Sequence, residues 1–122
     1  MSFSSSLIKI APDELAAALQ AVDGANVFDV RRAEAFAVNP IGIAGAQRWE
    51  PWTLPQRLSS LRAMNGRCHR LVMVCVYGHA VSQTACAIAA CHGFDAAYLE
   101  GGLDAWCELG LPTASFSGEG QP

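Results

Sequence analysis

The stretch Leu71–Ala85, LVMVCVYGHAVSQTA, decides how the rest of the chain is interpreted. It begins with five unbroken apolar residues, Leu71 to Cys75, which predict a buried strand. A turn at Tyr77-Gly78-His79 follows, and from about Val81 small and apolar residues predict a helix. A buried strand that passes through a tight loop into a helix N-terminus is typical of an anion-binding cradle, because the N–H groups of the loop and of the first helical turn point inward.

Cys75 lies at the edge of this predicted cradle. The positive end of a helix favours a thiolate over a neutral thiol, and the thiolate is the reactive form. We therefore predict that Cys75 is a nucleophile that carries a transferable group. The alternative is a buried cysteine that packs in the core as a small apolar residue. The loop and helix that follow Cys75 favour the nucleophile.

Length and composition exclude several classes of protein. A chain of 122 residues predicts one domain, large enough to bury a core. Apolar residues make up 52% of the chain, but no run approaches the ~18 residues of a membrane span. The N-terminal sequence MSFSSSLIKI lacks the features of a signal peptide, so we expect a soluble cytoplasmic protein that does not bind membranes. A net charge of −3 argues against nucleic acid as a partner.

The cysteines do not form a framework. There are five, and no C-x-x-C pair occurs among Cys68, Cys75, Cys86, Cys91 and Cys107. This disfavours a thioredoxin-type pair, the usual zinc fingers and disulfides, and indicates a reducing compartment. We interpret Cys86, Cys91 and Cys107 as apolar packing residues, and whether one of them reaches Cys75 stays open. Cys86 and Cys91 lie five residues apart on the predicted helix and diverge, so no metal site is expected.

Strand and helix signals alternate along the chain. Strands are predicted at residues 7–10, 26–30, 46–48, 71–75 and 95–99. Helices are predicted from Pro12 to about Asp23-Gly24, over 54–64 up to Asn65-Gly66, and over 81–91 and 103–109, with a helical turn at 31–36. The Gly- and Pro-rich segment 39–47 is predicted as a loop. This alternation predicts an α/β fold with a small parallel sheet, helices on both faces, and ligands at the carboxyl ends of the strands. We expect one domain over residues 1–114 and a disordered tail over 115–122.

Other polar candidates lie near the ends of these strands. Asp29 and Arg31 follow the second strand, where a structural ion pair is favoured over contact with substrate. Arg48 is a candidate for a positive charge at the mouth of the site. Ser82 has two interpretations that stay open, a donor to the sulfur of Cys75 or a hydrogen bond within the first helical turn.

Four separate pieces of the sequence resemble the rhodanese-like family. They are VFDVR at 27–31, IAGA at 43–46, the Cys75 loop, and GFDAAYLEGGLDAW at 93–106. Their order and spacing make the resemblance specific, and it covers about residues 7–112. It implies a rhodanese-like fold and a six-residue loop, here Cys75 to Ala80. It also implies a cysteine persulfide that receives sulfane sulfur from a small donor, thiosulfate or a persulfide, and passes it to cyanide or a thiol, a protein thiol included, without a cofactor.

The persulfide implied by the resemblance is an anion that needs stabilisation. Backbone N–H groups of the loop can hold its charge, and the binding loop is assigned to Val76, Tyr77, Gly78, His79, Ala80 and Val81. Gly78 allows the tight bend. The loop contains no Arg or Lys, so the dianion thiosulfate gains little beyond the backbone dipoles, and a less charged donor is favoured. Val81 stands where the related phosphatases carry an arginine that clamps phosphate, which disfavours phosphate chemistry.

The remaining side chains keep more than one interpretation. His79 is either a hydrogen-bonded loop residue or a proton donor beside the persulfide. Tyr77 is favoured as part of the pocket rim, and Trp49 and Trp52 as packing residues of a loop. Two functions follow. The first is a sulfurtransferase that uses a Cys75 persulfide, and the second is a non-catalytic module of the same fold that binds a partner or senses redox stress.

Overall fold

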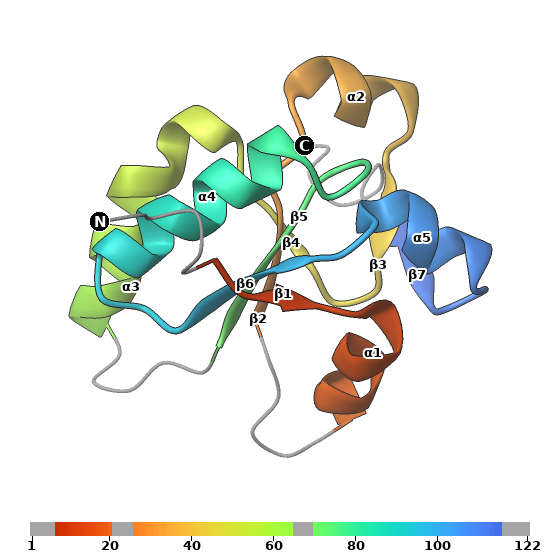
Figure 1. Ribbon diagram of the computed structural model, residues 1–122. Coiled ribbons are helices and arrows are strands. Elements are labelled where there is room, and N and C mark those ends of the chain that lie inside the picture. Colours follow the sequence, from red (N-terminus) through yellow and green to blue (C-terminus); the bar gives the residue numbers. More distant parts are fainter. Residues whose placement is uncertain (1–6, 21–25, 65–69, 116–122) are drawn as a thin grey trace.

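The computed structural model describes residues 7–20, 26–64 and 70–115. In chain order, its elements are β1 (Lys9–Ile10), α1 (Pro12–Gln20), β2 (Asn26–Asp29), α2 (Ala33–Val38), β3 (Ile41–Ile43), β4 (Gln47–Arg48), the 3₁₀ helix η2 (Pro51–Thr53), α3 (Leu54–Met64), β5 (Leu71–Val74), α4 (Ala80–Cys91), β6 (Ala96–Leu99), α5 (Gly102–Glu108) and β7 (Thr113–Ser115). Five strands form one parallel sheet in the order β1-β6-β5-β2-β4, which confirms the predicted α/β fold (Figure 1).

β5 is the central strand of this sheet. All four of its residues are buried, as expected for a parallel strand covered on both faces. At the carboxyl end of the sheet, Asp29 of β2 lies opposite Val74 of β5 and Arg48 of β4. Cys75 follows Val74 directly. The sheet therefore brings Cys75, Asp29 and Arg48 to the same edge, where ligands of parallel sheets gather.

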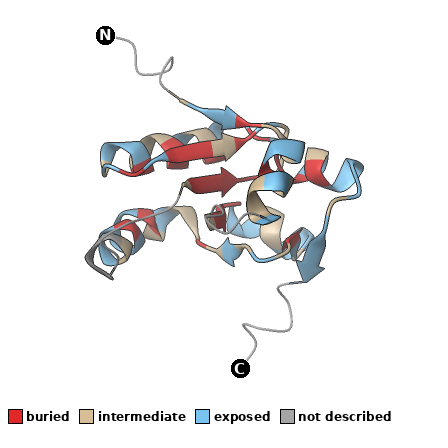
Figure 2. Ribbon diagram, turned by 90° about the horizontal axis from the view of Figure 1, so that it is seen from below, coloured by how far each residue is buried: buried red, intermediate tan, exposed pale blue. Residues whose placement is uncertain are grey.

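The strands bury alternate side chains in two cores. Leu71 and Met73 pack on one face, in the cluster that contains the buried residues of α3 and α4. Val72 and Val74 pack on the other face, with α1 and with Trp106 of α5. Figure 1 shows these helix pairs on opposite sides of the sheet, and Figure 2 shows the buried residues concentrated in the strands between them. Helices therefore cover both faces, as predicted.

The prediction of a loop over 39–47 was wrong for three residues. β3 pairs antiparallel with β7, from Ile41 opposite Ser115 to Ile43 opposite Thr113. A strand of three residues, with Pro40 directly before it and Gly45 two residues after it, has no periodic signal of its own. Its partner is distant in the sequence, so only the fold brings the two together. Ser115, predicted as the first residue of the tail, is the last residue of β7.

Several boundaries differ slightly from the predicted ones. α4 begins at Ala80, one residue earlier than predicted, and α2 covers 33–38 in place of a turn at 31–36. The predicted helix ends at Asp23-Gly24 and Asn65-Gly66, Cys68, and residues 116–122 lie outside the described residues. None of the helices in the described part of the chain combines the length and the apolar character needed to span a bilayer.

Candidate active site

The Cys75 loop is attached to the start of α5. The carbonyl of Cys75 accepts a hydrogen bond from the N–H of Leu103 (2.8 Å), and the carbonyl of Val76 accepts one from the N–H of Asp104 (2.9 Å). Leu103 and Asp104 lie in the first turn of α5, where N–H groups have no partner within the helix. The loop therefore supplies the acceptors that the helix end needs, and the helix end fixes the first two residues of the loop.

Two glycines allow this close approach. Gly78 has φ +76°, and a Cβ there would lie 2.6 Å from the carbonyl oxygen of Leu99. Gly102 has φ +63°, and a Cβ there would lie 2.5 Å from the carbonyl oxygens of both Cys75 and Val76. Both backbones are left-handed, a conformation that glycine adopts without strain. Gly78 therefore allows close contact with the start of α5 as well as the predicted bend. The close contact at Gly102 had not been predicted, although Gly102 belongs to the Gly-Gly pair in the 93–106 piece.

Ser82 is the side chain in contact with the sulfur of Cys75. The distance from Cys75 Sγ to Ser82 Oγ is 3.1 Å, and Ser82 Oγ lies 3.4 Å from the carbonyl oxygen of His79. Ser82 is fully buried. With a neutral thiol, the S–H donates to the hydroxyl and the hydroxyl donates to His79. With an anionic sulfur, the hydroxyl can rotate and donate to the sulfur. The hydrogen bond within the first helical turn is therefore present, whereas donation from Ser82 to the sulfur stays a prediction.

Asp29 and Arg31 form a buried ion pair. Arg31 Nη2 lies 2.7 Å from Asp29 Oδ2, and the two side chains are only 2% exposed or less. Arg31 also donates to the carbonyls of Asn39 (2.7 Å) and Ile41 (3.2 Å). The pair thus connects the end of β2 to the segment that enters β3, which agrees with the structural role favoured for these residues.

Arg48 contacts residues outside the Cys75 loop. Its Nη1 donates to the carbonyl of Asp29 (3.2 Å), and its guanidinium lies 4.6 Å from the centre of the Phe36 ring. Burial lowers the pKa of Arg48, while the negative charges of Asp29 and Glu50 oppose that shift. Arg48 lies at the predicted edge of the sheet but does not line either of the cavities that border the loop.

Two cavities border the loop on different sides. One, of about 230 Å³, reaches the loop at Ala80 and Val81, and its remaining wall comes from Arg32, Pro51, Leu54, Thr84, Ala85 and Ile88. The other, of about 330 Å³, reaches the loop at Val76, and its remaining wall comes from Arg31, Ala35, Val38, Asn39, Leu103, Asp104 and Cys107. Cys75 lines neither cavity and is 6% exposed. Arg32 had not been singled out in the sequence. It directly follows Arg31, the last residue of the VFDVR piece that resembles the family.

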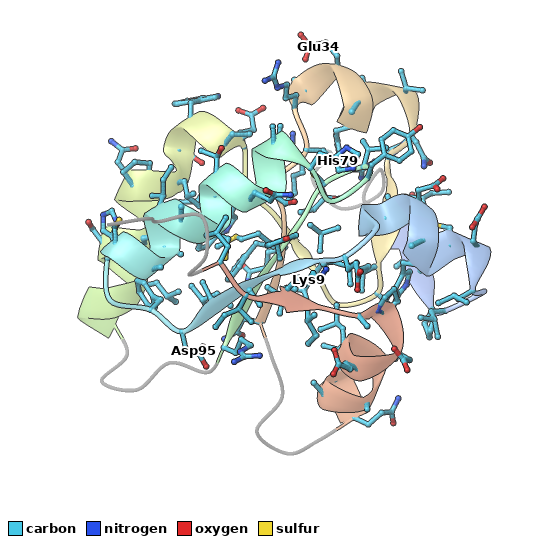
Figure 3. All side chains as sticks on the ribbon, viewed as in Figure 1. Lys9, Glu34, His79 and Asp95 are labelled. Carbon is cyan, nitrogen blue, oxygen red and sulfur yellow. The ribbon has the colours of Figure 1, made fainter. Side chains whose placement is uncertain are left out.

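The aromatic and histidine side chains around the loop differ in exposure. Tyr77 and His79 are both exposed, with their rings 6.3 Å apart. Figure 3 shows His79 at the carboxyl end of the strands, opposite to the end at which Asp95 lies. Trp49 is buried and stacks on Phe28, which confirms its predicted packing role. Trp52 is 76% exposed, so the packing role predicted for it was wrong, because it lies on the outer side of the η2 turn.

The other cysteines divide into buried and exposed. Burial raises the pKa of Cys86, which packs in the core as predicted. Cys91 and Cys107 are exposed, so their predicted packing role was wrong. They lie on the solvent side of α4 and α5, a placement that the short helical patterns did not reveal. Among the residues that the structure describes, no cluster of His, Cys, Asp and Glu is suited to hold a metal ion.

The chain is similar to known proteins in sequence and in fold. A family model described as a rhodanese-like domain matches residues 11–109. Among solved structures, a thiosulfate sulfurtransferase from Pseudomonas aeruginosa is 30% identical over 89% of this chain, with a TM-score of 0.72, but only 19% of its own length is matched. A rhodanese-like domain protein from Staphylococcus aureus is 28% identical, covering 82% of this chain and 91% of its own, with a TM-score of 0.66.

A third structure comes from Rhodopseudomonas palustris and is described as a protein of unknown function and possible tyrosine phosphatase. It has a TM-score of 0.76, covers 90% of this chain and 86% of its own, and is 21% identical, so it supports the fold alone. No curated protein matches the chain. The family match covers most of the sequence and includes β2, the Cys75 loop and the start of α5. The chain therefore belongs to the rhodanese-like domain family.

Proposed function

We propose that this domain is a sulfurtransferase in which Cys75 carries the transferred sulfur as a persulfide. The observation that supports this most directly is the contact between Cys75 Sγ and Ser82 Oγ, at 3.1 Å, in a loop that α5 holds from the other side. A buried hydroxyl beside a thiol can donate to either the thiolate or the persulfide anion. The free thiols Cys75, Cys86, Cys91 and Cys107 suit a reducing cytoplasm.

The reaction has two displacements at sulfur. In the first, the Cys75 thiolate attacks the outer sulfur of the donor and forms a new S–S bond. The bond between that sulfur and the rest of the donor breaks, and its electron pair leaves with the donor residue, as sulfite from thiosulfate or as a thiolate from a persulfide. In the second, a thiolate or cyanide acceptor attacks the outer sulfur of the persulfide and releases the Cys75 thiolate.

The first step leaves a negative charge on the outer sulfur of the persulfide, and the second leaves it on the sulfur of Cys75. Ser82 Oγ supplies one donor, and backbone N–H groups of Val76 to Val81 are proposed to supply the rest. The loop contains no Arg or Lys. Hydrogen bonds rather than an ion pair would therefore stabilise the intermediate. The same lack of a cation beside Cys75 argues against phosphatase chemistry, which needs a bidentate partner for phosphate.

One observation favours a second function, a non-catalytic module that binds a partner. Cys75 is only 6% exposed and lines neither of the cavities that border its loop. A donor must reach the sulfur across the edge of the loop. If sulfur donors cannot reach Cys75, the domain is not a sulfurtransferase and the fold serves to bind a partner.

Intact-mass measurement distinguishes the two functions. The protein is incubated separately with thiosulfate and with glutathione persulfide near neutral pH. The enzyme hypothesis predicts a gain of one sulfur atom that is absent from Cys75→Ser and retained in Cys107→Ser, which removes an exposed thiol. Failure of both donors to add sulfur to Cys75 would exclude the sulfurtransferase and leave the binding module.

A further inference from the structure

The side chain of Gln83 connects α4 to the Cys75 loop. Gln83 Nε2 donates a hydrogen bond to the carbonyl of Gly78 (3.0 Å), and the backbone N–H of Gln83 donates one to the carbonyl of His79 (3.0 Å). Gln83 is half-buried, and the bond to Gly78 is the hydrogen bond that its side chain forms within the described residues. One residue of α4 therefore holds two consecutive carbonyl groups of the loop.

These two hydrogen bonds fix the direction of two backbone N–H groups. The carbonyl of Gly78 and the N–H of His79 belong to one planar trans peptide, in which C=O and N–H point in opposite directions. The carbonyl of His79 and the N–H of Ala80 are related in the same way. Since Gln83 holds both carbonyls toward the body of α4, both N–H groups point the other way, out of the start of the helix.

The N–H groups of His79 and Ala80 have no acceptor among the residues that the structure describes. His79 is the N-cap residue of α4, and its side chain forms no cap hydrogen bond. The hydroxyl of Ser82 lies 3.1 Å from Cys75 Sγ and 3.4 Å from the carbonyl oxygen of His79, so the sulfur lies beside the turn that carries these N–H groups. A persulfide extends the Cys75 side chain by one S–S bond of about 2 Å. The start of α4 can therefore donate to an anion that Cys75 carries.

Gly78 cannot hold this orientation by itself. Its φ is +76°, and a residue without Cβ allows the peptide that follows it to rotate at little cost. A Cβ at Gly102 would lie 2.6 Å from the nitrogen of Gly78, so the start of α5 packs against that side of the glycine. On the carbonyl side, the contact is the amide of Gln83. The amide therefore decides whether the N–H of His79 or the carbonyl oxygen of Gly78 faces the loop.

We propose that Gln83 is a positioning residue, whose side-chain amide turns the N–H of His79 toward the sulfur that Cys75 carries. The inference rests on the proposed sulfurtransferase activity and names the residue that sets the direction of one loop donor. The backbone bond from Gln83 to His79 forms with any residue other than proline at this position, so the side chain controls the N–H of His79 and not that of Ala80. Without the amide, the carbonyl oxygen of Gly78 can turn toward the loop, where its partial negative charge repels a thiolate or a persulfide anion.

The test compares the rate of sulfur loading on Cys75 from glutathione persulfide in the wild type and in variants of Gln83. Gln83→Met keeps the length and the neutral charge of the side chain but removes the donor, and it should slow loading about tenfold or more, because a hydrogen bond to an anion is lost. Gln83→Glu places an acceptor against the carbonyl of Gly78 and should slow loading further. Gln56→Met is the matched control and should load at the wild-type rate, because Gln56 is exposed on α3 and lines a different cavity from those that border the loop.

A second measurement does not require sulfur transfer. Iodoacetamide alkylates thiolates, and peptide mass mapping gives its rates near neutral pH at Cys75 and at the exposed Cys107 of the same molecule. Gln83→Met should slow alkylation of Cys75 about tenfold and leave that of Cys107 unchanged. If Gln83 only kept the loop folded, its loss would uncover Cys75, which is 6% exposed, and alkylation would become faster.

The two measurements separate the inference from the proposed activity. Slower alkylation of Cys75 in Gln83→Met alone supports the positioning role even if no donor loads Cys75, in which case only the sulfurtransferase fails. A faster or unchanged rate of alkylation at Cys75, or an equal loss in Gln56→Met, overturns the inference.

Discussion

Gly78→Ala tests whether the loop must lie directly on the start of α5. Gly78 has φ +76°, and its added Cβ would lie 2.6 Å from the carbonyl oxygen of Leu99, 2.9 Å from the backbone nitrogen of Gly101 and 3.1 Å from that of Gly102. All three neighbours are backbone atoms, which cannot rotate away as a side chain can. The loop would have to withdraw from α5, and the hydrogen bonds that α5 donates to Cys75 and Val76 would lengthen.

The magnitude has two parts. A left-handed backbone costs an alanine about 1–2 kcal/mol. An extra carbon in a well-packed place costs about 1–3 kcal/mol more. Gly110→Ala separates the two, because Gly110 also has a positive φ of +71° but its added Cβ would meet nothing within 4 Å. We expect a loss of about 2–5 kcal/mol for Gly78→Ala and about 1–2 kcal/mol for Gly110→Ala.

The assay combines urea unfolding with the rate of sulfur loading on Cys75. A displacement of about 1 Å near a reacting atom can cost about a hundredfold in rate, so loading should slow strongly in Gly78→Ala. Gly110→Ala should load at the wild-type rate, since Gly110 follows the far end of α5. Equal stability and equal loading in the two variants would refute the close packing that we describe.

Three further outcomes follow from the described contacts. Ser82→Ala should slow sulfur loading about tenfold or more, because a hydrogen bond to the anionic sulfur of Cys75 is worth about 1.5–3 kcal/mol; an unchanged rate would exclude that role. Asp29→Asn should destabilise the fold by about 3 kcal/mol by leaving a buried guanidinium without its carboxylate, whereas Asp95→Asn, in an exposed pair, should cost less than about 1 kcal/mol in the same denaturation experiment. Burial raises the pKa of Cys86, so the stability due to its neutral thiol is present below about pH 8.5 and is lost as the pH rises through the raised value. Urea unfolding at about pH 8 and about pH 10 should therefore show a smaller loss for Cys86→Ala than for the wild type, and equal losses would contradict it.

The sheet could be predicted because its signals are local. LVMV at 71–74 is an unbroken apolar run, and the structure buries all four residues. The turn at Gly78 and the helix after it follow within a few residues, so strand, loop and helix are read from one continuous stretch. The ion pair of Asp29 and Arg31 could also be predicted, because Asp29 ends β2 and Arg31 lies two residues later, a spacing that lets one side chain reach the other.

Features that depend on distant partners could not be predicted in the same way. β3 forms because β7 returns beside it, and neither strand has enough residues to show a period. The importance of Gly102 comes from contact with Cys75 and Val76, and the sequence does not show that α5 begins under that loop. The exposure of Cys107 likewise depends on how α5 packs, because half of a short helix faces solvent and the pattern of seven residues is too brief to say which half.

The two arginines Arg32 and Arg48 near the carboxyl edge of the sheet differ in how their positive charges are engaged. The sequence offered Arg48 as a candidate for the positive charge missing from the loop. In the structure it is the last residue of β4, which pairs with β2. In the fold, that position makes Arg48 a partner of Asp29 and Phe36, because a side chain at the sheet edge is within reach of fixed acceptors and rings. Arg32 lies after the strand has ended, at the start of α2, where the backbone offers its side chain no such partner. Arg48 is therefore engaged by neighbours of its own, whereas Arg32 forms no ion pair among the described residues.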